Sequence, residues 1–251
     1  MLRQGPKRIY QGLRSSVQFL TIMPWPGEGA FDARAALPFF PICGLGIGVA
    51  LVVVDALASQ LWPRLIVSLI DVVALAVISG ALHLDGLADT ADGLYGRREP
   101  EKILSIMKDS RVGAMGVVVV VCGLFLKWMG IAHIAAHYKI WLLLVPAYAR
   151  AAVLFGTRFL PYGRPGGGTA HPFFHPPLKA TDFWSVVVLV ALSLLISWQS
   201  IILNAGFAAV MVTVLWWYRR KMNCITGDML GALIEIIETG LFLVAAIQWG
   251  A

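Results

Sequence analysis

Apolar runs of about 20 residues recur along the chain and constrain its fold more than any other feature. A helix needs about 20 consecutive apolar residues to cross a membrane, and seven stretches of the 251-residue sequence meet or approach that length. They cover residues 37–60, 65–84, 113–134, 140–157, 182–200, 203–218 and 229–249. These runs are too long for the alternating ten-residue strands of a membrane barrel. The sequence therefore predicts an all-α, polytopic transmembrane helical bundle with about seven spans.

Composition supports a membrane protein. Hydrophobic residues make up 59% of the chain and charged residues only 14%, whereas a soluble domain carries about 25% charged residues. No internal repeat or low-complexity segment divides the sequence, so we expect a single integral membrane domain over residues 1–251. Residues 1–35 mix basic and apolar side chains, a pattern typical of a short amphipathic segment that lies on the membrane surface.

The basic residues are distributed unevenly between the two sides of this predicted bundle. If the N-terminus is cytoplasmic, sixteen lysine and arginine residues fall in segments that face the cytoplasm, and only Arg64 and Lys139 face outward. This asymmetry follows the positive-inside rule. We therefore expect a multi-pass membrane protein with a cytoplasmic N-terminus, in contact with membrane lipid. Topology also accounts for the net charge of +6, so no nucleic-acid partner is expected.

Three carboxylates follow the second apolar run. In the segment His83–Gly93, the spacing of Asp85, Asp89 and Asp92 is four and then three residues. At about 100° per residue these side chains point into one arc of a helix surface. Their charges would repel one another unless a cation lay between them, and oxygen ligands suit Mg²⁺ or Mn²⁺. We predict a metal site here, at the cytoplasmic face; a solvated acidic helix surface is the alternative.

A polar loop with several basic residues follows the acidic motif, between residues 97 and 111. Within it, Lys108, Asp109 and Arg111 form a denser charged cluster than topology requires. Beside a metal site, such a loop suits a substrate that carries phosphates, because arginine binds phosphate oxygens in a bidentate manner. Residues 163–168, rich in glycine, form either a loop over a substrate or a plain connection.

Three more carboxylates, Asp228, Glu235 and Glu238, share one face of the last predicted span. Asp228 lies at the cytoplasmic level of the acidic motif and is placed to complete the metal site. Glu235 and Glu238 lie about 10–15 Å deeper, where ionisable groups normally face a partner. We expect them to pair with Arg150 or Lys127. A further expectation is that Gly231 allows close helix approach.

These motifs resemble those of the cobalamin synthase family, the adenosylcobinamide-GDP ribazoletransferases. The resemblance covers most of the chain, and its most specific part is the acidic motif together with residues 107–113. It also includes residues 20–24, 39–44 and 226–232. One departure is the pair Asn223 and Cys224, where the family tends to have glycines. This difference affects the turn into the last helix and leaves the acidic motif intact.

The aspartate spacing is also similar to that of the CDP-alcohol phosphatidyltransferases, so the resemblance implies an active site of that kind. Their fuller signature has an Ala-Arg pair after the first Asp-Gly, and that pair is absent after Asp85-Gly86. A phospholipid synthase of that class is therefore the alternative function. An ion-coupled transporter would predict an inverted repeat, and a prenyltransferase would need two full acidic motifs; the sequence has neither.

Membership of the cobalamin synthase family implies the final step of cobalamin nucleotide-loop assembly, at the bacterial cytoplasmic (inner) membrane. The cobinamide-phosphoryl group of adenosylcobinamide-GDP passes to α-ribazole, or to its 5′-phosphate, and GMP leaves. On that basis we hypothesise that Asp85, Asp89 and Asp92 hold one or two Mg²⁺ ions on the diphosphate. The sequence leaves the oligomeric state open, a homo-oligomer included.

The remaining roles in this hypothesis go to nearby polar side chains. Either Asp92 or Asp228 accepts the proton of the ribazole hydroxyl, and the sequence does not choose between them. The phosphate of GMP is bound by the basic loop, and two further side chains support the site. The phosphate-binding residues are Lys108 and Arg111, and the supporting residues are His83 and Asp109.

Overall fold

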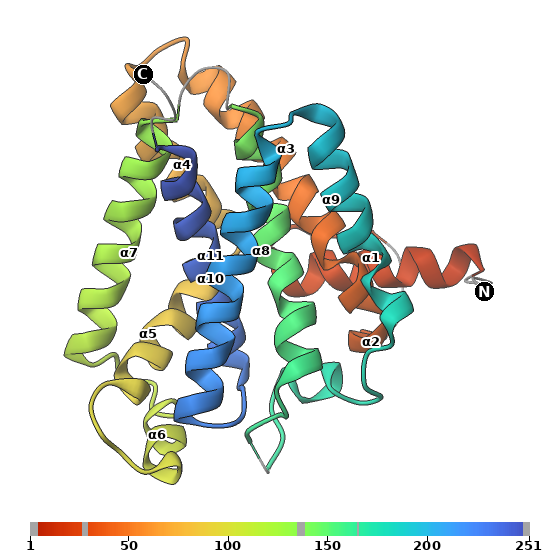
Figure 1. Cartoon of the computed structure of the whole chain (residues 1–251), viewed down its shortest axis with the longest axis vertical. Helices are drawn as coiled ribbons and strands as arrows, with labels where there is room; N and C mark the ends of the chain where they lie inside the picture. Colours follow the sequence, from red (N-terminus) through yellow and green to blue (C-terminus); the bar gives the residue numbers. More distant parts are fainter. Residues whose placement is uncertain (1–4, 27–29, 135–138, 165, 248–251) are drawn as a thin grey trace.

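The computed structural model describes residues 5–26, 30–134, 139–164 and 166–247, and it is built from helices (Figure 1). These are α1 (Pro6–Leu20), α2 (Ala33–Ala36), α3 (Phe40–Ala58), α4 (Arg64–Ile78), α5 (Leu82–Leu94), α6 (Pro100–Ile106), α7 (Ala114–Ala132), α8 (Ile140–Phe159), α9 (Trp184–Ile196), α10 (Ser200–Lys221) and α11 (Gly227–Ala245). Three short 3₁₀ segments, Leu37–Phe39, His171–Phe173 and Ala180–Phe183, join them. The all-α prediction is confirmed. Parts of the predicted surface segment and the end of the last predicted span lie outside the described residues.

Several helices are long and apolar enough to cross a membrane. Four pass this test alone: the helical stretch Ala33–Ala58, then α7, α8 and α10. The pair α4 and α5 passes together, which gives up to five candidate spans among the described residues. The helix α9 belongs to a shorter apolar stretch, and α11 carries three carboxylates. The structure therefore supports a multi-pass membrane protein with four or five candidate spans.

Two helices, α8 and α11, form the centre of the bundle. The helix α3 packs along α8, and α11 is in contact with α5, α7, α8 and α10. Most side chains of α8 and of α11 are buried. In Figure 1, α1 runs crosswise to these long helices, and its second half is largely buried against α2 and α3. This arrangement places α5, α8, α11 and the end of α1 around a common interior.

The second predicted span, residues 65–84, is wrong as a single helix. The helix α4 ends at Ile78, α5 begins at Leu82, and the two axes differ by 88°. Gly80 and Ala81 both adopt the left-handed conformation, with φ of 58° and 57°. Glycine adopts this conformation at no steric cost, and Ala81 adopts it against its usual preference. The bend separates the acidic motif from α4 and directs it toward α11.

The deep carboxylates of α11 are paired as expected. Lys127 of α7 donates hydrogen bonds to Glu235 and Glu238, at 2.6 and 2.7 Å. Arg150 of α8 donates to Glu238. All four side chains are buried, and two positive charges face two negative ones. The predicted pairing is confirmed, and it joins the three central helices α7, α8 and α11.

A second charged group lies at the end of the bundle where α3 meets α4. Arg64 and Lys139, the two basic residues predicted to face outward, both pair with Asp55. The Nζ atom of Lys139 lies 3.1 Å from the Asp55 carboxylate, and buried Asp71 lies 3.9 Å from the Arg64 guanidinium. These pairs are distant in the fold from the acidic motif of α5.

Candidate active site

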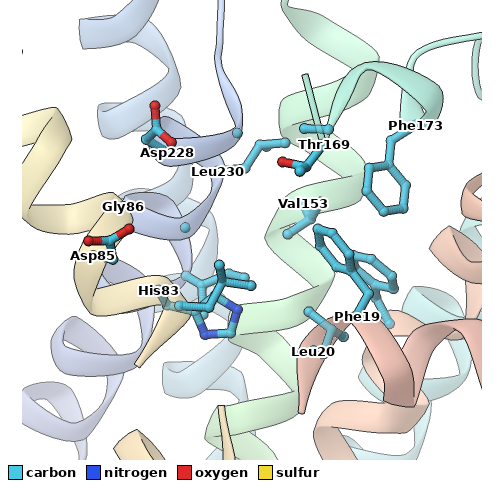
Figure 2. A pocket seen from close by; sticks show the side chains of 16 residues that line it. Phe19, Leu20, His83, Asp85, Gly86, Val153, Thr169, Phe173, Asp228 and Leu230 are labelled. Carbon is cyan, nitrogen blue, oxygen red and sulfur yellow. The ribbon is translucent and has the colours of Figure 1, made fainter. Parts of the chain in front are cut away.

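A cavity of about 150 Å³ lies between α5 and α11 on one side and α1 and α8 on the other. Figure 2 shows Asp85 and Asp228 on its acidic side and Phe19 and Phe173 on its apolar side. The acidic side chains come from α5 and α11, which are far apart in the sequence. The fold therefore brings the motif at residues 83–93 next to the motif at residues 226–232.

The two acidic helices approach each other closely at a glycine. A Cβ atom added to Gly86 would lie 2.7 Å from the carbonyl oxygen of Asp228, which is too close for any side chain. Opposite it, a Cβ on Gly231 would lie 3.4 Å from the Cα of His83, in ordinary contact. The two helices are thus close at Gly231, as expected, but an alanine would fit there; the position that requires glycine is Gly86. Glycine at residue 86 thus lets Asp85 and Asp228 line the same cavity.

Asp89 connects the acidic residues into one cluster. Its half-buried carboxylate interacts electrostatically with Asp85, Asp228 and Asp92, and with the guanidinium of Arg164. The four carboxylates therefore form one electrostatically coupled cluster. The helical spacing predicts this coupling for Asp85, Asp89 and Asp92. Such a concentration of negative charge favours a bound cation.

Asp92 differs from the other two aspartates of α5 in its contacts. One carboxylate oxygen accepts a hydrogen bond from the backbone N–H of Gly113 at 2.6 Å, and the other accepts from Gly116 at 2.9 Å. These N–H groups lie at the start of α7, where helix backbone donors are unpaired and the helix dipole is positive. Asp92 therefore fixes the start of α7 against α5.

The donor set of the cluster is compatible with magnesium. In the part of the chain that the structure describes, no three His, Cys, Asp or Glu side chains are grouped as a ready-made metal site. Mg²⁺ is usually held by only one or two carboxylates, with substrate phosphates and water completing the coordination. Asp85 and Asp89, with Asp228 beside them, supply oxygen ligands of that kind. The metal role of Asp85, Asp89 and Asp92 stays a prediction.

The basic loop lines a second cleft, of about 390 Å³, beside the start of α7. Asp92, Arg98, Asp109 and Arg111 all line it. Arg111 donates side-chain hydrogen bonds to both oxygens of Asp109, at 3.0 and 2.7 Å, and these bonds lower the pKa of Asp109 to about 2. Lys108 is exposed next to this cleft. A phosphate role for Lys108 and Arg111 stays a prediction.

Arg164 is a site residue that the sequence analysis does not single out. Its guanidinium donates a hydrogen bond to Asp228 and another, 3.1 Å long, to the carbonyl oxygen of Met107. It therefore connects the glycine-rich loop at residues 163–168 to the acidic cluster and to the loop at residues 107–113. One arginine among several near glycines gives no distinctive signal in the sequence.

The other supporting residue, His83, is buried and lines the cavity. Neither of its ring nitrogens has a hydrogen-bond partner within the described residues. Within the described residues, His83 therefore does not form the supporting hydrogen bond that the sequence leads us to expect.

These features define a helical membrane protein whose carboxylate-lined cavity is flanked by arginines, a combination suited to phosphate-bearing substrates. The chain belongs to the cobalamin-5-phosphate synthase family, whose sequence profile matches residues 12–246. This result confirms the family resemblance derived from the motifs.

Individual relatives match almost the full chain. An adenosylcobinamide-GDP ribazoletransferase of Chlorobaculum tepidum is 34% identical over 249 residues, covering 95% of this chain and 96% of that protein. Its counterpart from Chlorobaculum parvum is 36% identical over 250 residues, with the same shares covered. Another, from Herpetosiphon aurantiacus, is 34% identical over 240 residues, covering 93% of this chain and 95% of that protein. No solved structure matches the chain.

Proposed function

We propose that the chain is an adenosylcobinamide-GDP ribazoletransferase of cobalamin synthesis. The observation that carries this proposal is its identity of 34–36% with proteins of that name over 95% of its length. In the reaction, a ribose hydroxyl of α-ribazole, or of its 5′-phosphate, attacks the phosphorus that bears cobinamide. The bond from that phosphorus to the bridging oxygen of GMP breaks, GMP leaves, and the hydroxyl proton passes to a base.

Asp85 and Asp89 are the carboxylates to which we assign magnesium, or manganese in its place. The electrostatic coupling of Asp89 to Asp85, Asp92 and Asp228 supports this assignment, since Arg164 offsets only one of these negative charges. Bound there, the ion would neutralise charge on the diphosphate oxygens. In this proposal the aspartates act on the diphosphate as in the CDP-alcohol phosphatidyltransferases. The carboxylates come from two helices, α5 and α11, rather than from a single motif.

For the proton acceptor we favour Asp228 over Asp92. Both oxygens of Asp92 already accept backbone hydrogen bonds from the start of α7, which commits this carboxylate to holding that helix end. Asp228 lines the cavity together with Asp85. Its pairing with Arg164 holds the carboxylate in place, and the same arginine lies close enough to the acidic cluster to contact a substrate phosphate. Asp92 then acts by positioning α5 against α7.

The phosphate of GMP is assigned to the basic cleft. Arg98 and Arg111 line it, and exposed Lys108 lies beside it. Arginine binds phosphate through two parallel hydrogen bonds. In this arrangement Asp109 holds the Arg111 side chain by two hydrogen bonds until the substrate arrives.

The proposed topology has seven crossings and a cytoplasmic active site. Arg98, Arg111 and Arg164 lie at the end of the bundle that carries the acidic cluster, and Arg64 and Lys139 lie at the α3–α4 end. This distribution agrees with the positive-inside rule. Exposed apolar side chains on the outer helices, such as Phe125 and Trp216, provide the surface that contacts lipid.

The test is a turnover assay on the purified full-length protein in detergent. With adenosylcobinamide-GDP, α-ribazole and Mg²⁺, we expect GMP and the completed corrinoid in equal amounts. Chelation of divalent ions should stop the reaction, and Mn²⁺ should restore it. A protein that releases no GMP under these conditions, or that releases it equally well in a chelator, would contradict the proposal. Transfer from a CDP-linked lipid to an alcohol instead would identify the alternative function.

A further inference from the structure

The cavity beside Asp85 and Asp228 has an apolar half that phosphoryl transfer alone does not explain. Phe19, Phe40 and Phe173 form one wall, with ring centroids 4.7 to 6.0 Å apart. Figure 2 shows Phe19 and Phe173 across the cavity from the two carboxylates. A site that is acidic at one end and aromatic at the other fits a ligand with a polar end and a flat, apolar body.

His83 is the polar side chain buried within this cavity. It is only 2% exposed, and neither ring nitrogen has a hydrogen-bond partner among the described residues. Its charged neighbours are committed elsewhere, because Lys127 and Arg150 donate to the carboxylates of α11. Buried polar groups are normally paired, since an unpaired one loses its hydrogen bonds to water without replacement. An unpaired histidine that lines a cavity therefore indicates a ligand that supplies the partner.

We infer that this cavity binds the base of the acceptor nucleoside, and that His83 donates a hydrogen bond to the one free ring nitrogen of that base. The inference rests on the proposed function, which supplies α-ribazole as the acceptor. The base of α-ribazole is a dimethyl-substituted benzimidazole, a flat apolar bicycle. One of its nitrogens is bonded to ribose, and the other is a hydrogen-bond acceptor. A neutral imidazole always carries one N–H group, and the free ring nitrogen of the base can accept a hydrogen bond from it.

The position of His83 also determines how the acceptor nucleoside is oriented in the cavity. With the base between the phenylalanine wall and His83, its ribose extends toward Asp85 and Asp228, which line the same cavity. A hydroxyl of that ribose then lies on the side of the proposed proton acceptor. The nucleoside thus enters with its reacting end toward the acidic cluster.

The same chemistry excludes the other nucleoside in the reaction. Guanine carries several hydrogen-bond donors and acceptors on its ring edges. A base held between the phenylalanine wall and His83 has only the histidine as a polar partner, because Asp85 and Asp228 lie across the cavity from that wall. Burying unpaired polar groups is costly, and sites discriminate strongly on this basis. The cavity therefore separates the acceptor base from the guanosine half of the donor, which we place at the basic cleft.

The experiment compares two ribosides that differ by one atom. One has 5,6-dimethylbenzimidazole as its base, and the other has 5,6-dimethylindole, in which the free nitrogen is replaced by C–H. Binding to the full-length protein in detergent is measured by titration calorimetry, without donor or metal. We expect the benzimidazole riboside to bind about tenfold more tightly, as one neutral hydrogen bond allows. His83→Leu should abolish this preference, and His83→Gln, which keeps an N–H donor, should retain part of it.

A matched control is His133→Leu, which changes an exposed histidine at the far end of α7. This variant should keep the wild-type preference. Equal binding of the two ribosides by the wild type would overturn the inference, and so would an unchanged preference in His83→Leu. The GMP-release assay distinguishes this failure from that of the proposed function. If the wild type releases GMP but does not distinguish the two ribosides, only the role of His83 is contradicted, and the proposed function stands.

Discussion

The substitution Gly86→Ala tests how closely α5 and α11 must approach for activity. The added Cβ atom would lie 2.7 Å from the carbonyl oxygen of Asp228 and 3.1 Å from its Cα. Both are backbone atoms, so a side-chain rotation cannot relieve the contact. Ordinary contact begins at 3.4 Å, and the helices must therefore separate by up to about 0.7 Å.

Such overpacking typically costs about 1–3 kcal/mol, and alanine returns up to about 1 kcal/mol through its higher helix propensity. The net loss of stability is therefore modest. Catalysis is more sensitive, because a misplacement of about 1 Å can cost a factor of about 100. We expect GMP release to slow by about 10- to 100-fold while the melting temperature in detergent falls by only a few degrees.

Both quantities are measured on the same preparation, by GMP release and by thermal unfolding. The control is Gly123→Ala on α7, where a Cβ would lie 3.6 Å from the Leu87 side chain, in ordinary contact. This variant should release GMP at the wild-type rate, and its melting temperature should stay the same or rise slightly through the higher helix propensity of alanine. Wild-type turnover by Gly86→Ala would refute the argument that Asp85 and Asp228 act across this contact.

Three further substitutions test separate parts of the site and the bundle. Asp89→Asn should lower GMP release by about 100-fold or more without changing the melting temperature, and an unchanged rate would contradict its metal role. Glu238→Gln leaves Lys127 and Arg150 short of a partner, so unfolding in detergent should become easier by about 3–5 kcal/mol; an unshifted unfolding transition would be inconsistent with this network. Asp92→Asn should weaken the start of α7 by about 0.5–2 kcal/mol, with faster hydrogen exchange at residues 113–116; unchanged exchange there would argue against the positioning role.

The sequence predicts the features that depend on a general physical requirement. A charge within an apolar run needs a partner, and this requirement leads from Glu235 and Glu238 to Lys127 and Arg150, which are paired as expected. Helical periodicity likewise places the aspartates of residues 85–92 on one helix. The long apolar runs predict most helices to within a few residues of their observed bounds.

Features that depend on long-range packing are not predictable in this way. The break at Gly80 and Ala81 lies within an apolar run, so hydropathy alone does not reveal it. The hydrogen bonds of Asp92 to the start of α7 and the pairing of Arg164 with Asp228 each join segments whose proximity only the fold provides. The phenylalanine wall of the cavity likewise combines residues from three separate segments.

The central claim is that the acidic cluster between α5 and α11 binds a divalent cation together with the diphosphate of the donor. The most direct test is a Mn²⁺ titration of the detergent-purified protein, followed by electron paramagnetic resonance, with adenosylcobinamide-GDP present. We expect the wild type to bind one or two Mn²⁺ ions and the double variant Asp85→Asn, Asp89→Asn to lose at least tenfold in affinity. If the double variant binds Mn²⁺ as tightly as the wild type, the cation lies elsewhere and the account of the site is wrong.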